Sequence, residues 1–373
     1  MIPNILKGFT KRLFSALCLF GVFVAALSTG APESKELRIS VVAYNTENLF
    51  DTEDDPKIKD ETYLPLELKK NEAHKKACKS QNARYASRMW DCLFLDWNQS
   101  LLDVKMKNLS EQIMSAPGGR GPDVLILEEV ENRKVVEELN KKFLSKAGYT
   151  VTHFDSKDER GIDQAILSRY PLIKYEYHYI AVEKKRRKSK KSKKNKKTTE
   201  VAKTKDLRGI LHAHLNIGTE TAPRVLHVLA LHLPSQGAKF NERAVVLNEL
   251  NKLALKVPAN DVLIAGGDFN ITSKEWDKEK VYKSYFENIW RPAHMDGCKD
   301  CKGTYYYPGN KEWSFFDLLL LRFDREKKAR WHWDAKSVKT LSTNKSMYPV
   351  RFDPNKLKGA SDHFPIYAEL VVD

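Results

Sequence analysis

The feature that most constrains the fold is a series of short runs that are apolar throughout. Two of them read VLIL at 124–127 and VLIAG at 262–266. Runs of this kind indicate strands buried on both faces, as in sheets packed between other layers. At 373 residues and 42% hydrophobic, the chain can bury a large core in one big domain or two ordinary ones. This composition excludes collagen, a disordered chain and a polytopic membrane protein.

The same reading places further elements along the chain. We predict strands at 37–44, 124–127, 164–168, 209–216, 225–231, 262–265, 316–321 and 364–372. Residues 101–114 carry apolar side chains at helical spacing and predict a helix, and 242–255 predict a second one. Residues 51–97 are polar and irregular, and we expect them to be an insertion.

The N-terminus predicts export. Three basic residues and no acid stand in residues 1–12, and Leu13–Leu27 is an apolar run of 15 residues followed by small residues. This pattern is typical of a secretory signal peptide, and the run is short for a membrane span, which needs about 20 residues. We therefore expect a signal peptide at 1–31, a mature domain at 32–373 and a secreted or periplasmic protein. An uncleaved anchor is the alternative, and no other stretch is apolar enough to span a bilayer.

Export changes how the cysteines are interpreted. Four remain after residue 31, and an even number in an oxidising compartment favours two disulfides. Proximity in sequence suggests the pairs Cys78–Cys92 and Cys298–Cys301. A zinc site of four thiolates is the alternative, but only Cys298 and Cys301 have the CxxC spacing that it needs.

The positive charge is concentrated in one tract. The net charge is +15, of which residues 183–197 carry +10 (eleven Lys or Arg, one Glu) and residues 1–12 carry +3, which leaves +2. Such a density of like charges predicts a Lys-rich disordered loop, here 183–204. It suits a tether for a polyanion or an anionic surface, although a solvated loop insertion explains it equally well.

Polar residues follow the apolar strands at six places. They are Asn45 and Glu47, Glu128 and Glu129, His232 and Ser235, Asp268 and Asn270, Asp317, and Asp362 and His363. If these strand ends share one edge, they form a pocket of carboxylates with two imidazoles, and such a cluster implies a cation. Oxygen ligands favour Mg²⁺, Mn²⁺ or Ca²⁺ over zinc. A hard cation beside two histidines is suited to phosphoester hydrolysis.

These residues stand in motifs that resemble a known family. The motifs NTENLF, PDVLILEEVEN, GIDQAILSR, LHLPSQ, GGDFN, FFDLLLL and GASDHFPI run in order through nearly the whole mature chain. The set is similar to the endonuclease/exonuclease/phosphatase superfamily, which has the deoxyribonuclease I-like fold. The resemblance implies an α/β fold, a four-layer α/β/β/α sandwich with two central mixed β-sheets, helices outside and the active site at one edge.

The resemblance also implies roles for the metal-site residues. Glu129 matches the principal metal-binding Glu, and Glu128 stands where the family commonly has Gln. Asp362, Asn45 and Glu47 match further positions of the metal and phosphate site. The implied cofactor is Mg²⁺, with Mn²⁺ as a substitute and Ca²⁺ left open as a structural ion.

The catalytic roles follow by the same correspondence. Asp268 and Asn270 match the pair that positions the attacking water and the phosphate. His363, oriented by Asp317, is expected to order or activate that water. His232 is expected to contact the phosphate or protonate the leaving oxygen. Asp163 matches an acid that orients His232 in deoxyribonuclease-like members. Which histidine is the acid and which the base stays open.

One of the phosphate-contacting positions departs from the family pattern. Several members have a Tyr near the start of GIDQAILSR, and here that place holds Gly161 beside Arg160. Arg160 and Arg208 are candidate phosphate ligands, since guanidinium binds phosphate oxygens well, and Ser235 is a third. For each arginine, an ordinary solvated loop residue is the alternative.

We therefore expect a secreted, metal-dependent phosphodiesterase, specifically a sequence-independent DNA endonuclease that acts as a monomer, with RNA as an open substrate. A secreted sphingomyelinase is the main alternative. It requires exposed aromatic residues for membrane insertion, and the candidates are residues 89–97 and Tyr305–Tyr307. A packed segment pinned by Cys92 is the other explanation of 89–97. A non-catalytic binding protein is disfavoured because the full catalytic set is present.

Overall fold

The computed structural model describes residues 36–156, 158–183, 204–323, 330–343 and 347–373. The predicted signal peptide and nearly all of the predicted Lys-rich loop lie outside the described residues. Within them, no helix has both the length and the hydrophobicity that a bilayer crossing requires.

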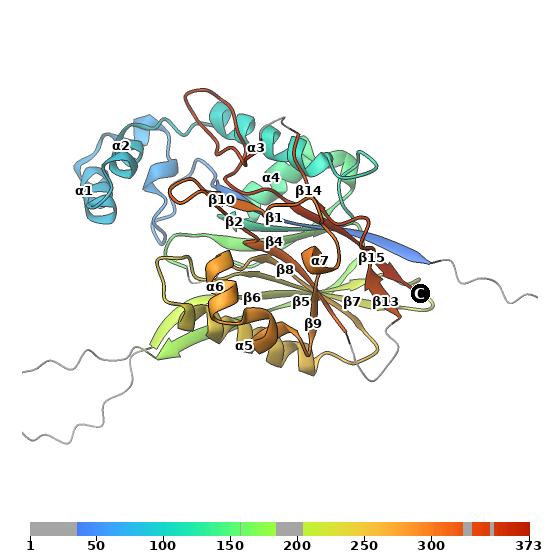
Figure 1. Ribbon diagram of the computed structural model, residues 1–373. Helices are drawn as coiled ribbons and strands as arrows, with labels where there is room; N and C mark the ends of the chain where they lie inside the picture. The colour runs from blue at the N-terminus through green and yellow to red at the C-terminus, as the bar shows by residue number, and fades with distance from the viewer. Residues whose placement is uncertain (1–35, 157, 184–203, 324–329, 344–346) are drawn as a thin grey trace, which may run out of the picture. The chain divides into compact units, whose positions relative to one another are not determined.

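Two mixed sheets form the centre of the fold (Figure 1). The first sheet has the order β13-β15-β1-β2-β4-β3, with β14 paired to β15, and only β1 and β2 run parallel. Its strands are β1 (Leu37–Leu49), β2 (Val124–Val130), β3 (Thr150–His153), β4 (Asp163–Ser168), β13 (Trp331–Trp333), β14 (Lys339–Thr340) and β15 (Ile366–Val372).

The second sheet has the order β5-β6-β7-β8-β12-β9, and only β7 and β8 run parallel. Its strands are β5 (Leu172–Glu183), β6 (Thr204–Asn216), β7 (Val225–His232), β8 (Val262–Asp268), β9 (Trp290–Pro292) and β12 (Asp317–Arg322). A separate hairpin joins β10 (Tyr305–Tyr307) to β11 (Glu312–Ser314).

The sheets pack face to face, and helices cover their outer faces. One buried cluster between the sheets joins Ile39 and Val41 of β1 to Val228 of β7 and Ile264 of β8. A second cluster packs α3 (Gln99–Met114) and α4 (Arg133–Phe143) on the first sheet. A third packs α5 (Phe240–Lys256) on the second sheet. The predicted four-layer sandwich is confirmed, because strands with two apolar faces need a layer on each side.

Residues 51–97, whose irregular sequence pattern predicted no helix or strand, contain α1 (Glu72–Asn82) and α2 (Ala86–Phe94), and short helical turns at Glu61–Tyr63 and Leu66–Lys70. That they are an insertion stays a prediction. The Asn71 side chain accepts a hydrogen bond from the His74 backbone N–H and caps α1. The remaining short helices are α6 (Ser273–Lys278), α7 (Ala293–Asp296), and turns at Ser145–Ala147 and Tyr282–Phe286.

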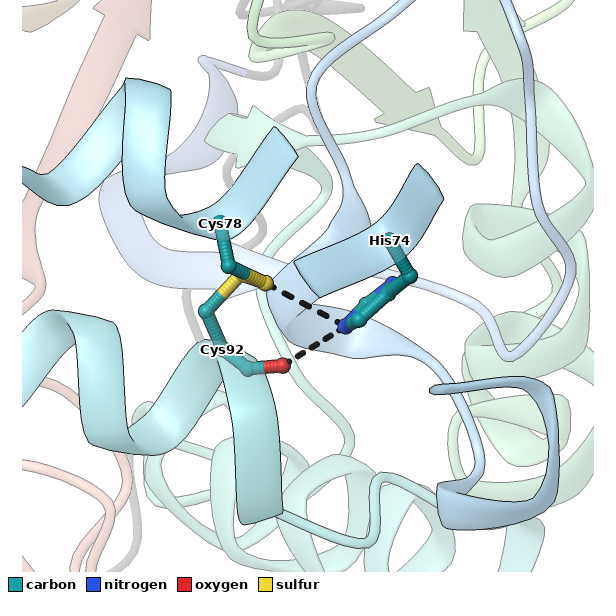
Figure 2. Close-up of side chains that lie close together, drawn as sticks. All are labelled: His74, Cys78 and Cys92. Carbon is teal, nitrogen blue, oxygen red and sulfur yellow. Dashed lines mark hydrogen bonds between the residues drawn. A yellow bond between two sulfur atoms is a disulfide. The ribbon is translucent and has the colours of Figure 1, made fainter. Parts of the chain in front are cut away.

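A disulfide between Cys78 of α1 and Cys92 of α2 holds this helix pair together (Figure 2). His74 lies beside it, with Nε2 2.9 Å from the Cys92 carbonyl oxygen and 3.2 Å from Cys78 Sγ. Cys298 and Cys301 form the second disulfide. Both predicted pairings are confirmed. Since all four sulfurs are bonded to each other in pairs, no thiolate is left for the alternative zinc site.

Candidate active site

The polar strand ends meet at one edge of the sandwich, and hydrogen bonds join the two sheets there. Asn45, on β1 of the first sheet, donates from Nδ2 to Asp268 Oδ2 of the second sheet at 2.9 Å. Its backbone N–H donates to Asp317 Oδ1 at 3.3 Å. All three residues are buried. The expected shared edge is therefore present.

His363 and Asp317 form a tight buried pair. His363 Nδ1 lies 2.7 Å from Asp317 Oδ2. Burial alone would lower the pKa of His363, but the Asp317 carboxylate raises that pKa well above its ordinary value. Ser361 fixes the backbone here, since its Oγ accepts from the His363 N–H and donates to the Asn45 carbonyl. The ring of His363 is thus held in place and protonated at neutral pH.

His232, at the end of β7, has the opposite protonation state. Its Nε2 lies 3.5 Å from Asp268 Oδ2 and 3.9 Å from Glu129 Oε1. Burial, and secondarily the nearby charges of Arg208 and Arg160, lower the pKa of His232 well below its ordinary value. The edge therefore presents one charged and one neutral imidazole.

Asp163 is buried, but it is not joined to His232 in this structure. Its Oδ2 accepts from the Ser156 N–H at 3.0 Å, and burial raises its pKa to about 7. Its Oδ1 and His232 Nδ1 are both buried without a hydrogen-bond partner. That Asp163 orients His232 stays a prediction.

Asp268 and Asn270 form a compact unit at the end of β8. Asp268 Oδ1 accepts from the Asn270 N–H at 2.8 Å, and its Oδ2 accepts from Asn270 Nδ2 at 3.0 Å. Asn270 adopts the left-handed conformation, with φ of 50°. The pKa of Asp268 is raised to about 7 by burial, which outweighs the attraction of His363. Asp268 is thus able to accept a proton near neutral pH.

The close approach of strands at this unit explains the second glycine of GGDFN. Gly267 has φ of 136°, and a Cβ there would lie 2.0 Å from the Leu231 carbonyl oxygen of β7. It would also lie 2.7 Å from Glu128 Oε1. Only glycine fits, because both the φ angle and the lack of space exclude a side chain.

Glu129 is aimed into the site by a bulge in β2. In the pairing of β2 with β4, the register shifts between Glu128 and Val130, and Glu129 has φ of 60°. Glu129 Oε2 accepts from the Asn48 N–H at 3.1 Å. Glu128 is fully buried with both carboxyl oxygens unpartnered, and burial, with Asp317 and Asp268 nearby, raises its pKa well above the ordinary value. A protonated Glu128 matches the neutral Gln common at this place in the family.

Glu47 and Asp362 lie side by side at the rim. Glu47 Oε2 accepts from the Asp362 N–H at 3.0 Å, and burial together with the charge of Asp362 raises the pKa of Glu47 to about 7. Arg351 forms ion pairs with both, at 3.8 Å to Asp362 Oδ2. Glu47 therefore forms an ion pair with the Arg351 guanidinium and also accepts a hydrogen bond from the Asp362 backbone.

The donor set fits a hard divalent cation. Glu129, Asp362, Glu47 and Asn45 offer carboxylate and amide oxygens, which are the ligands that Mg²⁺ and Mn²⁺ prefer. The raised pKa values of Glu47 and Asp268 reflect burial and carboxylate repulsion that a cation would relieve. Among the described residues, however, no three of the acidic and histidine groups at this edge lie within 4.8 Å of one another. An ion would have to draw the ligands together.

The three candidate phosphate ligands differ in their surroundings. Arg208 is largely buried, and its Nε and one Nη donate to the carbonyls of His232 and Leu233 at 3.1 Å. The structure thus gives Arg208 a positioning role at the end of β7. Arg160 is exposed, with one Nη 3.5 Å from Asn48 Oδ1, so its guanidinium can reach a ligand. Ser235 lies exposed in the loop after β7.

Sequence reasoning missed two cations that shape the edge. Lys105 of α3 is buried and donates to the carbonyls of Glu47 and Ala360, and burial lowers its pKa to about 8. In the sequence, Lys105 is one of several polar residues of an amphipathic helix, and no motif indicates that it lies at the site. Arg351 lies in a loop without a motif, so its pairing with Glu47 had no sequence signal.

Comparison with known proteins gives three results. The model of the Endonuclease/Exonuclease/phosphatase family matches residues 40–90 and 94–371. No curated protein matches. Solved structures match over most of the chain at low identity.

A Bacteroides thetaiotaomicron family protein is 13% identical with a TM-score of 0.52, covering 91% of this chain and 99% of that one. A Bacteroides vulgatus family protein is 11% identical with a TM-score of 0.50, covering 90% and 100%. D. rerio TDP2 in complex with a single-strand DNA product is 16% identical with a TM-score of 0.49, covering 89% and 98%. At these identities, the two Bacteroides structures support the fold alone.

Proposed function

Because this chain belongs to the endonuclease/exonuclease/phosphatase family, whose members are typically phosphodiesterases or phosphatases, we propose that it is a secreted, metal-dependent DNA endonuclease with little sequence specificity. The observation that carries the proposal is the buried edge where Asp268, His232 and the His363–Asp317 pair meet. Two imidazoles with opposite pKa shifts beside a carboxylate provide the groups for water attack on a phosphodiester.

The metal ion would be held by Glu129 and Asp362, with Asn45 and Glu47 beside them. When bound, Mg²⁺ supplies positive charge to the phosphate oxygens. The remaining chemistry belongs to the protein. Asp268 and Asn270, which are hydrogen-bonded to each other, would orient the attacking water, and the pKa of about 7 suits Asp268 to take its proton.

The pKa shifts favour one assignment of the two histidines. His363 carries a proton that it can donate to an oxygen of the phosphodiester, because Asp317 stabilises the imidazolium. His232 is neutral and is suited to donating a hydrogen bond to a phosphate oxygen. The resemblance left open which histidine is the acid. This assignment makes His363 the acid and keeps the phosphate contact that was one of the two expected roles of His232.

The proposals that the substrate is DNA and that the protein is exported rest on the sequence. The tract at 183–197 carries eleven Lys or Arg, and such a charge would attract a polyanion at long range. The predicted signal peptide would deliver the enzyme to an oxidising compartment, and the two disulfides are compatible with that location.

The test is cleavage of supercoiled plasmid by the purified protein, in Mg²⁺ and again in EDTA. The proposal predicts Mg²⁺-dependent conversion to nicked and then linear forms, with no preferred fragment sizes. RNA and sphingomyelin vesicles are assayed in parallel. Cleavage of sphingomyelin without plasmid nicking would contradict the assignment of DNA as the substrate but would still support these active-site residues. No hydrolysis of any phosphoester would favour a non-catalytic binding protein.

One observation favours the sphingomyelinase alternative as a second candidate. The segment 89–97 forms most of α2, and Trp90 and Phe94 on that helix are 65% and 52% exposed with ring centroids 4.4 Å apart. Cys92 on the same helix is buried in its disulfide. The disulfide of Cys92 therefore holds the segment in place, as the packed-segment explanation expected. The segment also exposes two aromatic rings that could insert into a membrane. In this second case, substituting Trp90 and Phe94 with Ser would abolish vesicle binding and sphingomyelin cleavage. If the protein is a DNA endonuclease, the same substitutions would leave plasmid nicking unchanged.

A further inference from the structure

The outer face of the second sheet carries a cluster of buried histidines away from the active site. His212 and His214 are two residues apart on β6 and share a face, and His227 of β7 pairs directly with His214. Leu211 and Ala213 point the other way, into the core between the sheets. Along β7, His227 stands five residues before His232, which is roughly 16 Å at ~3.3 Å per residue, and faces the opposite side.

The ring nitrogens of these histidines converge. One nitrogen from each of His212, His214 and His227 lies within 4.8 Å of the other two. His212 Nε2 is 2.9 Å from His227 Nδ1, and the rings of His214 and His227 have centroids 4.5 Å apart. Zinc binds imidazole nitrogen at about 2.0–2.1 Å, which places two nitrogens of one tetrahedral site about 3.3 Å apart. The cluster needs only small ring movements to hold such an ion.

Hydrogen bonding alone explains only part of this arrangement. A chain runs from His178 Nε2 to His212 Nδ1 at 3.4 Å, from His212 to His227, and from His227 Nε2 to Asp261 Oδ2 at 3.2 Å. It leaves out His214, whose Nε2 is buried without a hydrogen-bond partner. Buried imidazole nitrogens normally have a partner. A cation bound by the cluster would provide one.

The surroundings favour neutral rings that can bind an ion. Burial lowers the pKa of His212 to about 2 and that of His214 to about 4, with repulsion between the rings adding to the effect, and burial also lowers the pKa of His227. Two carboxylates adjoin the cluster: Glu176 of β5 lies 3.8 Å from His214 Nε2, and Asp261 holds His227. A carboxylate behind a ligand histidine is the usual outer partner in zinc sites. The other charged groups facing the four rings are Lys174 on β5, Glu249 and Lys256 on α5, and Arg322 on β12.

We propose that His212, His214 and His227 form a second, non-catalytic metal site that binds Zn²⁺, with Glu176 beside His214 as an outer carboxylate. Imidazole donors select zinc and its transition-metal neighbours over Mg²⁺ and Ca²⁺. The two sites of the protein would therefore take different ions. Because His212 and His214 lie on β6 and His227 on β7, the ion would cross-link two neighbouring strands. Residues 184–203, which contain most of the basic tract, connect β5 to β6.

The test is zinc binding by the purified protein after chelator treatment and dialysis, followed by elemental analysis and titration calorimetry. The variant is His214→Gln combined with His227→Gln, and the matched control is His332→Gln, an exposed histidine of β13 outside the cluster. We expect the wild type and the control to bind one zinc ion that the cluster variant binds at least 100-fold more weakly. Zinc should raise the thermal midpoint of the wild type by about 3 °C or more and leave the cluster variant unchanged.

A second measurement separates this site from the active site and does not depend on the cluster variant folding. X-ray absorption of the zinc-loaded Glu129→Gln protein, which lacks the principal acidic ligand of the catalytic edge, should show three imidazole ligands. Equal zinc affinity in the wild type and a folded cluster variant would overturn the proposal, and so would one imidazole or none around the bound zinc. Mg²⁺-dependent activity should be the same in the cluster variant and the wild type, since none of its residues lies at the catalytic edge.

Discussion

Replacing Gly267 with Ala tests the close contact that positions His232 and Asp268. The added Cβ would lie 2.0 Å from the backbone oxygen of Leu231, where ordinary contact begins near 3.4 Å. β7 and β8 must therefore separate by more than 1 Å at this pair, or the backbone must twist. Strain at a φ of 136° contributes about 1–3 kcal/mol and overpacking of the core a similar amount. We expect a loss of about 4 kcal/mol in the free energy of unfolding.

The assay is urea unfolding followed by circular dichroism, with phosphodiesterase activity measured on the folded fraction. Leu231 and Gly267 directly precede His232 and Asp268 in paired strands, so activity should fall about 100-fold even where the protein folds, since a displacement of 1 Å is enough. Gly237→Ala is the matched control, because only Ser235 Oγ at 3.8 Å would lie near its Cβ. A Gly267→Ala protein within about 1 kcal/mol of the wild type would refute this reasoning.

Three further predictions address the site, the disulfide and the basic tract. Asp317→Asn should lower the pKa of His363, since burial remains when the carboxylate is removed, and should reduce the cleavage rate by about 10²- to 10⁴-fold; an NMR titration of His363 and single-turnover cleavage measure the two effects. Replacing both Cys78 and Cys92 with Ser opens a loop with a sequence separation of 14 and should destabilise the protein by about 3 kcal/mol in denaturant unfolding. Deleting residues 183–197 should weaken DNA binding and flatten its dependence on salt concentration without changing the rate of cleavage of bound DNA; an unchanged slope would exclude the tether.

The apolar strands were predictable because their environment is uniform. VLIL and VLIAG lie in β2 and β8, at the centre of their sheets with layers on both faces, so every position is apolar. β5 was missed because it is an edge strand in which only Ile180 is buried. Residues 174–179 (KYEYHY) do alternate polar and aromatic side chains, which is a strand pattern, but β5 has no run of four or more aliphatic residues, the signal that identified β2 and β8. The helices of 51–97 were missed because α1 is polar and mostly exposed, and is held by a cap and a disulfide.

The site was predictable where strand ends supply the chemistry, and not where side chains arrive from elsewhere. Asn45, Asp268 and Asp317 follow or begin apolar strands, and the paired sheets bring them together. Arg351 reaches Glu47 across 304 positions of sequence, and no local pattern encodes such a contact. The histidines of β6 were overlooked although their alternation in LHAHLN places them on one face.

The most direct test of the central claim is plasmid nicking by His363→Ala beside the wild type, in Mg²⁺ and in EDTA. His332→Ala, which removes an exposed histidine of β13, is the control, and thermal unfolding verifies that each protein is folded. The account predicts nicking by the wild type and the control in Mg²⁺ only, with at least a 100-fold loss in His363→Ala. Nicking by a folded His363→Ala protein at a rate close to that of the wild type, or nicking that persists in EDTA, would contradict it.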